Sequence, residues 1–83
     1  MNKTVVASTL KHLSNAQGYY TPETTLHVLV NADVPGFLPV DTLRGELHQM
    51  KAKGWIDYEV DDYGCEKWRI TERGRIQLKE VGA

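Results

Sequence analysis

Apolar residues recur with helical spacing in three stretches of the chain, near residues 4–16, 22–31 and 41–53. Within each stretch they fall three or four positions apart, which is the spacing of a helix with one buried face. The pattern therefore predicts three amphipathic helices whose apolar sides share one core. Those sides are formed by Val6, Leu10 and Leu13; by Leu26, Leu29 and Val30; and by Leu43, Leu47 and Met50.

Residues with known capping preferences mark the ends of the second and third helices. Thr21 can cap the second helix, and Pro22 has the backbone angle of a first helical position. Asn31 is the expected end of that helix. Asp41 is the expected cap of the third helix, and Gly54 follows its last turn.

The connection between these helices, residues 32–39, is predicted to be an ordered loop. It contains the turn signal Pro35-Gly36 and is longer than the turn of a compact helix-turn-helix. We expect the apolar residues Phe37 and Leu38 to hold it against the core. Earlier in the chain, Tyr19-Tyr20 is too short for a strand of its own but could add one edge pairing to a sheet.

After Gly54 the spacing changes from helical to alternating. Two runs of alternating apolar and charged residues flank Asp61-Asp62-Tyr63-Gly64, which predicts a β-hairpin with one face packed on the helices. The inward side chains are Ile56, Tyr58 and Val60 on one strand, and Trp68 and Ile70 on the other. On the solvent face, Asp57 and Glu59 can pair with Lys67 and Arg69.

A short last helix is predicted to follow the hairpin. Thr71 can cap it, and Ile76 and Leu78 are its apolar residues. Gly74 lies inside this helix and limits the length expected of it. Trp55 and Trp68 are expected to pack the hairpin onto the helices.

The amino-acid composition limits the classes of protein to which the chain can belong. The 83 residues make one domain, and their 41% hydrophobic and 25% charged fractions are ordinary for a soluble globular protein. No apolar run approaches the roughly 20 residues that span a bilayer, and the N-terminus lacks the apolar stretch of a secretion signal. The single cysteine, Cys65, fits a reducing compartment and hence a cytoplasmic location. The net charge of −1 means that any affinity for nucleic acid must come from a local patch.

Motifs for catalysis or metal binding do not occur in the sequence. There is no Gly-rich phosphate loop, nucleophile elbow or carboxylate constellation. His12, His27 and His48 lie on three different predicted elements without metal-ligand spacing. We therefore expect neither an enzyme nor a cofactor or metal site.

Three motifs carry a resemblance to a known family: Leu43-Arg44-Gly45-Glu46-Leu47, Lys53-Gly54-Trp55-Ile56 and Trp68-Arg69-Ile70-Thr71-Glu72-Arg73-Gly74. In this order they resemble the winged-helix signature of small bacterial regulators. The chain as a whole also resembles short winged-helix proteins of Mu-like prophages. The resemblance implies an α+β fold, with a three-helix core, a β-hairpin wing and a short C-terminal helix in a single domain over residues 1–83. It departs from DNA-binding relatives in the acidic residues Asp61, Asp62 and Glu66, which stand where a basic wing tip is expected.

The resemblance implies that the protein is a DNA-binding transcriptional regulator, with its third helix, about residues 41–53, in the major groove. Arginine and glutamine are suited to base edges and lysine to phosphates. The helix residues expected at DNA are Thr42, Arg44, His48, Gln49, Lys51 and Lys53, and those of the wing are Tyr63, Lys67 and Arg69. So small a footprint favours a homodimer. The alternative is a protein–protein interaction module of phage or bacterial origin that does not bind DNA, which the neutral charge and the acidic wing favour.

Overall fold

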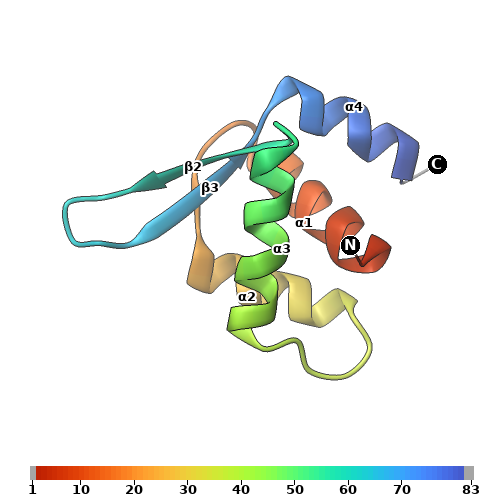
Figure 1. Cartoon of the computed structure of the whole chain (residues 1–83), viewed down its shortest axis with the longest axis horizontal. Helices are drawn as coiled ribbons and strands as arrows, with labels where there is room; N and C mark the ends of the chain where they lie inside the picture. The colour runs from red at the N-terminus through yellow and green to blue at the C-terminus, as the bar shows by residue number, and fades with distance from the viewer. Residues whose placement is uncertain (1, 82–83) are drawn as a thin grey trace.

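The helices and strands follow the predicted order, with one short strand added before the second helix. The structure, a computed structural model, describes residues 2–81. The elements are α1 (Lys3–Asn15), β1 (Thr21–Pro22), α2 (Glu23–Asp33), α3 (Val40–Ala52), β2 (Ile56–Val60), β3 (Glu66–Ile70) and α4 (Glu72–Val81). The β2–β3 hairpin projects away from the helices, and α1 and α4 pack together on the opposite side (Figure 1).

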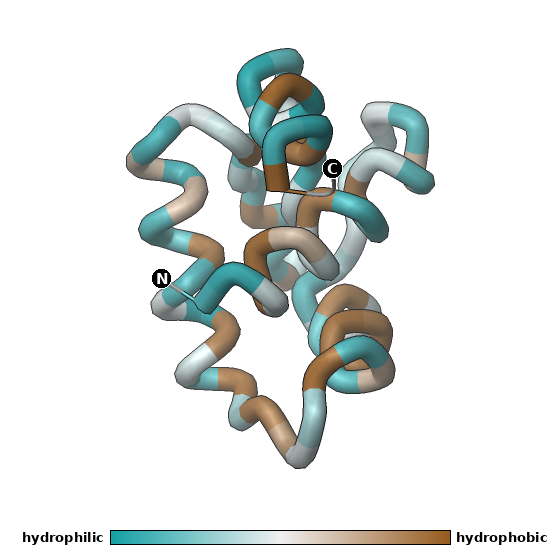
Figure 2. The backbone as a smooth tube through the Cα atoms, turned by 90° about the vertical axis from the view of Figure 1, so that its right-hand side faces the viewer, coloured by the Kyte–Doolittle hydropathy of each residue, from teal (hydrophilic) through white to brown (hydrophobic). Residues whose placement is uncertain are grey.

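The core forms where the apolar sides of the helices meet the inner face of the hairpin. Its buried apolar residues are Val5, Val6, Leu10, Leu13, Leu26, Val30, Leu43, Leu47, Met50, Ile56, Trp68 and Ile70. Apolar and polar stretches alternate along each helix (Figure 2). The predicted stripes are thus confirmed, except that Leu29 is only half-buried.

The sheet has the strand order β1-β3-β2, and both pairings are antiparallel. Tyr58 lies opposite Trp68, while Asp57 lies opposite Arg69, so the predicted alternation of faces is confirmed. Val60 is an exception, with 47% of its surface exposed, because the hairpin extends beyond the helices at that point. The edge pairing falls at Thr21–Pro22 rather than at Tyr19-Tyr20.

The predicted caps of α2 and α3 were wrong. The N-cap residues are Pro22 and Pro39, and neither makes a side-chain capping bond. Thr21 pairs with Trp68 in the sheet, which places α2 one residue later than predicted. Asp41 lies in the first turn of α3, where its charge still interacts favourably with the positive end of the helix.

Asn31 does not end α2, which continues to Asp33, but it holds the following loop. Its Oδ1 accepts a bond from the Leu38 backbone N–H at 2.6 Å, and its Nδ2 donates to the Leu38 carbonyl at 3.1 Å. The same carbonyl lies 2.7 Å from Nε2 of His27. Leu38 is half-buried as expected, but Phe37 is 75% exposed, so its predicted packing against the core was wrong. The loop is therefore held by hydrogen bonds between its backbone at Leu38 and the side chains of Asn31 and His27 on α2.

The junction between the hairpin and α4 depends on Thr71 and Gly74. Thr71 Oγ1 accepts from the Gly74 N–H at 3.1 Å and donates to the Gly54 carbonyl at 2.6 Å, which confirms Thr71 as a cap. A Cβ atom on Gly74 would lie 2.1 Å from the Trp55 carbonyl oxygen, so only glycine permits this approach. Gly74 therefore allows α4 to pack and does not shorten it.

Candidate functional site

The outer face of α3 is fixed by its inner face. Because Leu43, Leu47 and Met50 are fully buried, the opposite side of the helix is left in solvent. The residues exposed there are Asp41, Thr42, Gly45, His48, Gln49, Lys51, Ala52 and Lys53. Five of the six predicted helix residues thus lie on one accessible surface, beside the hairpin (Figure 1).

The two lysines of this face are free of ion pairs within residues 2–81. The Lys53 ammonium lies 5.5 Å from the centre of the Trp55 ring, a weak surface cation–π contact. Both amines can therefore turn toward an anion at little cost.

His48 lies where α3 meets the hairpin. Its ring packs edge-on against Trp68, with centroids 5.3 Å apart, and lies 5.7 Å from the ring of Tyr58. These contacts restrain the imidazole while leaving the residue exposed. His48 is thus a polar group whose ring is restrained by the hairpin while the residue stays exposed.

Arg44 differs from the other helix residues because its guanidinium has partners inside the protein. Nη2 donates to Oε2 of Glu23 at 2.8 Å, and Nε donates to the same oxygen at 3.2 Å. Nε also lies 3.5 Å from Oε2 of Glu66 on β3. These two carboxylates raise the pKa of Arg44. The sequence pattern groups Arg44 with the free residues, but the structure places it in an internal network.

Glu23, the first residue of α2, is the centre of that network. It is only 6% exposed, and its Oε1 accepts a bond from the indole N–H of Trp68 at 3.2 Å. Burial raises the pKa of Glu23, but the hydrogen bonds that it accepts from Arg44 and from Trp68 lower it below its ordinary value. Glu23 is therefore a buried, charged carboxylate, a role that its position at a helix start does not reveal.

Glu66 extends the network to the second strand of the hairpin. Its Oε1 accepts a bond from the Tyr58 hydroxyl at 3.0 Å. Burial and this bond to a carboxylate raise the pKa of Tyr58. Glu66, which the sequence marks only as an acidic wing residue, joins both strands to Arg44.

The two predicted wing cations lie on the other face of the hairpin. Arg69 contacts Asp57 at 3.2 Å, and Lys67 lies 3.9 Å from Glu59, as the alternating pattern predicts. Both cations also lie over the ring of Tyr20, at 4.9 Å for Arg69 and 6.0 Å for Lys67. Period two directs them away from the face that holds Tyr58 and Trp68, so they do not join the α3 surface.

The wing tip is a turn organised by Asp61. Its Oδ1 accepts bonds from the backbone N–H groups of Tyr63 and Cys65, both at 2.9 Å, and the Cys65 bond is the main cause of its lowered pKa. The side chain of Tyr63 is left 92% exposed at the end of the hairpin. Asp61 thus begins the predicted Asp61-Asp62-Tyr63-Gly64 turn, and its carboxylate stabilises that turn as aspartate commonly does at a turn start.

Charge is distributed unevenly over this surface. Residues 40–70, which include α3 and the whole wing, carry seven acidic and five basic side chains. Arg44, Lys67 and Arg69 are already paired with carboxylates. The free positive charge of the surface therefore lies at Lys51 and Lys53, at the C-terminal end of α3.

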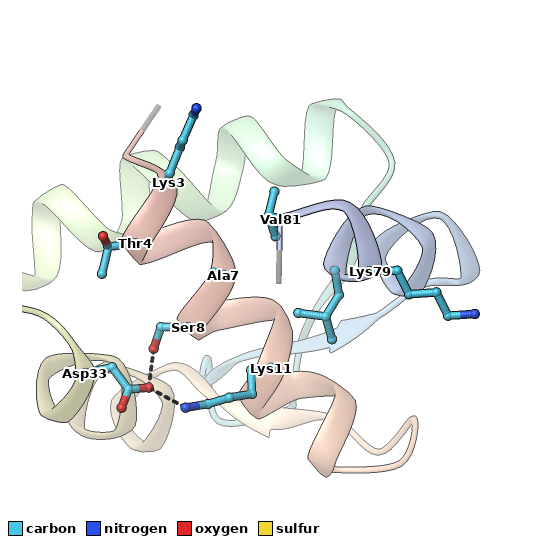
Figure 3. A pocket seen from close by; sticks show the side chains of 9 residues that line it. Lys3, Thr4, Ala7, Ser8, Lys11, Asp33, Lys79 and Val81 are labelled. Atoms are coloured by element: carbon cyan, nitrogen blue, oxygen red, sulfur yellow. Dashed lines mark hydrogen bonds and ion pairs between the residues drawn. The ribbon is translucent and has the colours of Figure 1, made fainter. Parts of the chain in front are cut away.

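A second polar cluster lies at the far end of α2, beside a groove of about 850 Å³ between α1 and α4. Asp33 accepts bonds from Ser8 at 2.7 Å and Lys11 at 3.0 Å (Figure 3). It also accepts one from His12 at 2.8 Å. The bond from Ser8 is the first of the causes that lower the pKa of Asp33 to about 2. In residues 2–81 no group of three or more His, Cys, Asp or Glu side chains is arranged to hold a metal ion. Nor is any helix of this part long and apolar enough to cross a membrane.

Comparisons with protein-family models and with curated proteins gave no match. A solved structure, a MarR-family transcriptional regulator from Silicibacter pomeroyi, is similar to 94% of this chain with a TM-score of 0.77 and 26% sequence identity. The match covers 48% of that regulator, so the chain spans about half its length. The resemblance to prophage proteins stays a prediction. The order of elements, the β1-β3-β2 sheet and this match together show that the chain is a winged-helix domain similar to that of a transcriptional regulator.

Proposed function

We propose that the protein is a transcriptional regulator that binds duplex DNA, with α3 in the major groove. The observation that carries this proposal is the outer face of α3, where five of the six predicted residues are exposed next to the projecting hairpin. A helix of this kind is the element that enters the major groove in helix-turn-helix proteins. The similarity to a structure described as a transcriptional regulator supports the same interpretation.

The residues of this face divide by chemistry. His48 and Gln49 are suited to base edges, and Thr42 can reach either a base or a phosphate. Lys51 and Lys53 are suited to phosphates because their amines are unpaired within the described chain. Tyr63 would meet the DNA at the wing tip, whereas Lys67 and Arg69 would have to exchange their carboxylate partners for phosphates.

Weak, salt-sensitive binding by one copy follows from the charge of the surface. With the two free lysines and one wing cation released from its carboxylate, about three phosphates would be neutralised, giving a log–log salt slope near −3. A homodimer would then double the contacts and raise the affinity. The exposed free cysteine fits a protein of the reducing cytoplasm.

The test is binding to a pool of random duplexes, measured by fluorescence anisotropy at several salt concentrations. We expect binding at about 50 mM salt that weakens steeply as salt rises. The double variant Lys51→Gln/Lys53→Gln should reduce the slope by about 2. Its matched control is Lys3→Gln/Lys79→Gln, which removes two exposed lysines that line the groove between α1 and α4 (Figure 3).

The control makes the test specific for α3. If the two pairs of variants weaken binding equally, the DNA contact is diffuse. If only Lys3→Gln/Lys79→Gln weakens it, DNA lies on the α1–α4 side and the proposed interface is wrong. No binding at low salt by any form of the protein would reject DNA as the ligand.

A second candidate function is a protein-interaction module, and the charge of the surface favours it. Seven acidic residues on α3 and the wing would repel a phosphate backbone but would suit a basic protein surface. Replacing Asp62 and Glu59 by glutamine would distinguish the two functions. DNA binding should strengthen with these changes, whereas capture of a basic partner should weaken.

A further inference from the structure

We propose that Arg44 is a positioning residue, which sets the angle between the wing and α3 and reads no base. This inference rests on the proposed function, because the two surfaces that it aligns are those proposed to meet DNA. Its basis is the network that joins Arg44 to Glu23 and Glu66.

Two nitrogens of the Arg44 guanidinium are already engaged by a carboxylate of the protein. Arginine recognises guanine through two parallel N–H groups. In this structure Nε and Nη2 form that fork with a single oxygen of Glu23, and Nε also faces Glu66. Reading a base with the same fork would require Arg44 to leave both carboxylates.

If Arg44 left these contacts, it would leave a buried carboxylate behind. Glu23 is 6% exposed, and without Arg44 only the indole N–H of Trp68 would hydrogen-bond to it. A buried charge that loses its partner is strongly unfavourable. The network therefore favours Arg44 in its internal position when DNA approaches.

The contacts of Arg44 lead to the wing. From Arg44 they run through Glu66 to Tyr58, and through Glu23 to Trp68, and so they reach both strands of the hairpin. The other contacts between α3 and the wing are the rings of His48, Tyr58 and Trp68 and the apolar side chains of the shared core, which can slide over one another. The hydrogen bonds by which Arg44 and Trp68 meet on Glu23 are directional and cannot slide in this way. The Arg44 guanidinium thus supplies the directional restraint between α3 and the projecting hairpin.

The experiment compares Arg44→Met with Gln49→Ala, a change on the same helix that touches no part of the network. Two quantities are measured for each: amide hydrogen exchange along the chain, and affinity for a preferred duplex and a scrambled one. The preferred duplex is selected from a random pool with the wild-type protein. Arg44→Lys is a second variant, which keeps the charge but loses the planar fork.

For Arg44→Met we expect faster exchange in β2 and β3 with unchanged exchange in α1, and an equal loss of affinity for both duplexes. Arg44→Lys should show the same pattern, which also covers the case in which Arg44→Met fails to fold. For Gln49→Ala we expect unchanged exchange in the hairpin and a loss of preference of roughly tenfold for one base pair.

The proposal is overturned if Arg44→Met or Arg44→Lys loses preference for one base pair while exchange in the hairpin stays at the wild-type level. Unchanged exchange with unchanged affinity would overturn it as well. If the wild-type protein binds no DNA, the proposed function fails, but exchange in the hairpin still shows whether Arg44 restrains the wing. The two failures are therefore distinguishable.

Discussion

Each end of α2 carries a carboxylate with several hydrogen-bonding partners, and one of the two is buried while the other is exposed. Glu23 begins the helix, is buried, and binds groups from α3 and the wing. Asp33 ends the same helix, is exposed, and binds groups from α1 only. The helix dipole favours a negative charge at the first position and disfavours it at the last, so Asp33 depends more on nearby cations.

The difference between Glu23 and Asp33 shows how burial determines what a carboxylate contributes to the stability of the fold. Glu23 and Trp68 are both buried, so a hydrogen bond lost between them leaves a polar group that water cannot reach. At Asp33 water can replace the exposed Lys11, although the partner Ser8 is itself buried, and exposed ion pairs contribute little. Glu23 therefore organises the proposed DNA-binding surface, whereas Asp33 only fastens α1 to α2.

The largest expected effect comes from removing the side chain that covers Glu23. Trp68→Ala should lower the free energy of unfolding by about 3–5 kcal/mol, because it empties the centre of the core and deletes a donor to Glu23. Chemical denaturation of the variant and the wild type measures this loss. Trp68→Phe is the control, since it keeps most of the apolar volume and should cost less. A Trp68→Ala protein that melts within a few degrees of the wild type would contradict the burial of Trp68.

The next largest effect is expected from removing the two carboxylates of α2 one at a time. Glu23→Ala should destabilise by about 1–3 kcal/mol, because the indole N–H of Trp68 then has no acceptor and Arg44 loses its main partner. Asp33→Ala should lower the melting temperature less, because the exposed Lys11 ammonium regains water and only the buried Ser8 hydroxyl loses its acceptor inside the protein. Thermal unfolding of both variants at neutral pH measures the difference. Equal losses would show that burial does not separate the two clusters.

The paired wing charges show what a sequence pattern can predict. Alternation fixes which face of a strand each residue occupies, and a hairpin turn fixes which residues lie opposite each other. The pairs of Asp57 with Arg69 and Glu59 with Lys67 are therefore predictable from the sequence alone. The same argument identifies the buried face of α3 and, by exclusion, its exposed face.

The network around Arg44 could not be predicted in the same way. Glu23 lies 21 residues before Arg44 in the sequence, and no periodicity connects two helices joined by an irregular loop. By residue type Arg44 suggests base recognition, and Glu23 suggests a favourable charge at a helix start. Only their approach in three dimensions shows that each is the other's partner. The caps were misassigned for a related reason, because Thr21 is engaged in a sheet pairing that its local sequence does not reveal.

The contribution of Asp33 to the stability of the fold should depend on pH. Its folded-state pKa of about 2 lies below the ordinary value of 3.8, so its partners stabilise the fold fully above that ordinary value. This contribution is lost as pH falls from 3.8 through about 2, because the carboxylate then becomes protonated in the folded state too. The difference in melting temperature between wild type and Asp33→Asn should therefore shrink over that interval. A difference that stays constant down to the lowest pH would contradict the depressed pKa.

The smallest effect on stability is expected at the wing tip, where Asp61 and Asp62 are neighbours with different roles. Asp61 binds two backbone N–H groups of the turn, whereas no hydrogen bond or ion pair of the described chain involves the side chain of Asp62. Asp62→Lys should therefore change the free energy of unfolding by no more than about 0.5 kcal/mol. The same change should strengthen DNA binding under the proposed function, because it replaces a repelled charge by an attracted one near the backbone. Asp61→Lys is the matched comparison: it makes the same change of charge but also removes the bonds that form the turn, so it should destabilise the hairpin. If Asp62→Lys leaves DNA affinity unchanged at low salt while Lys51→Gln weakens it, the α3 surface binds DNA without the wing tip.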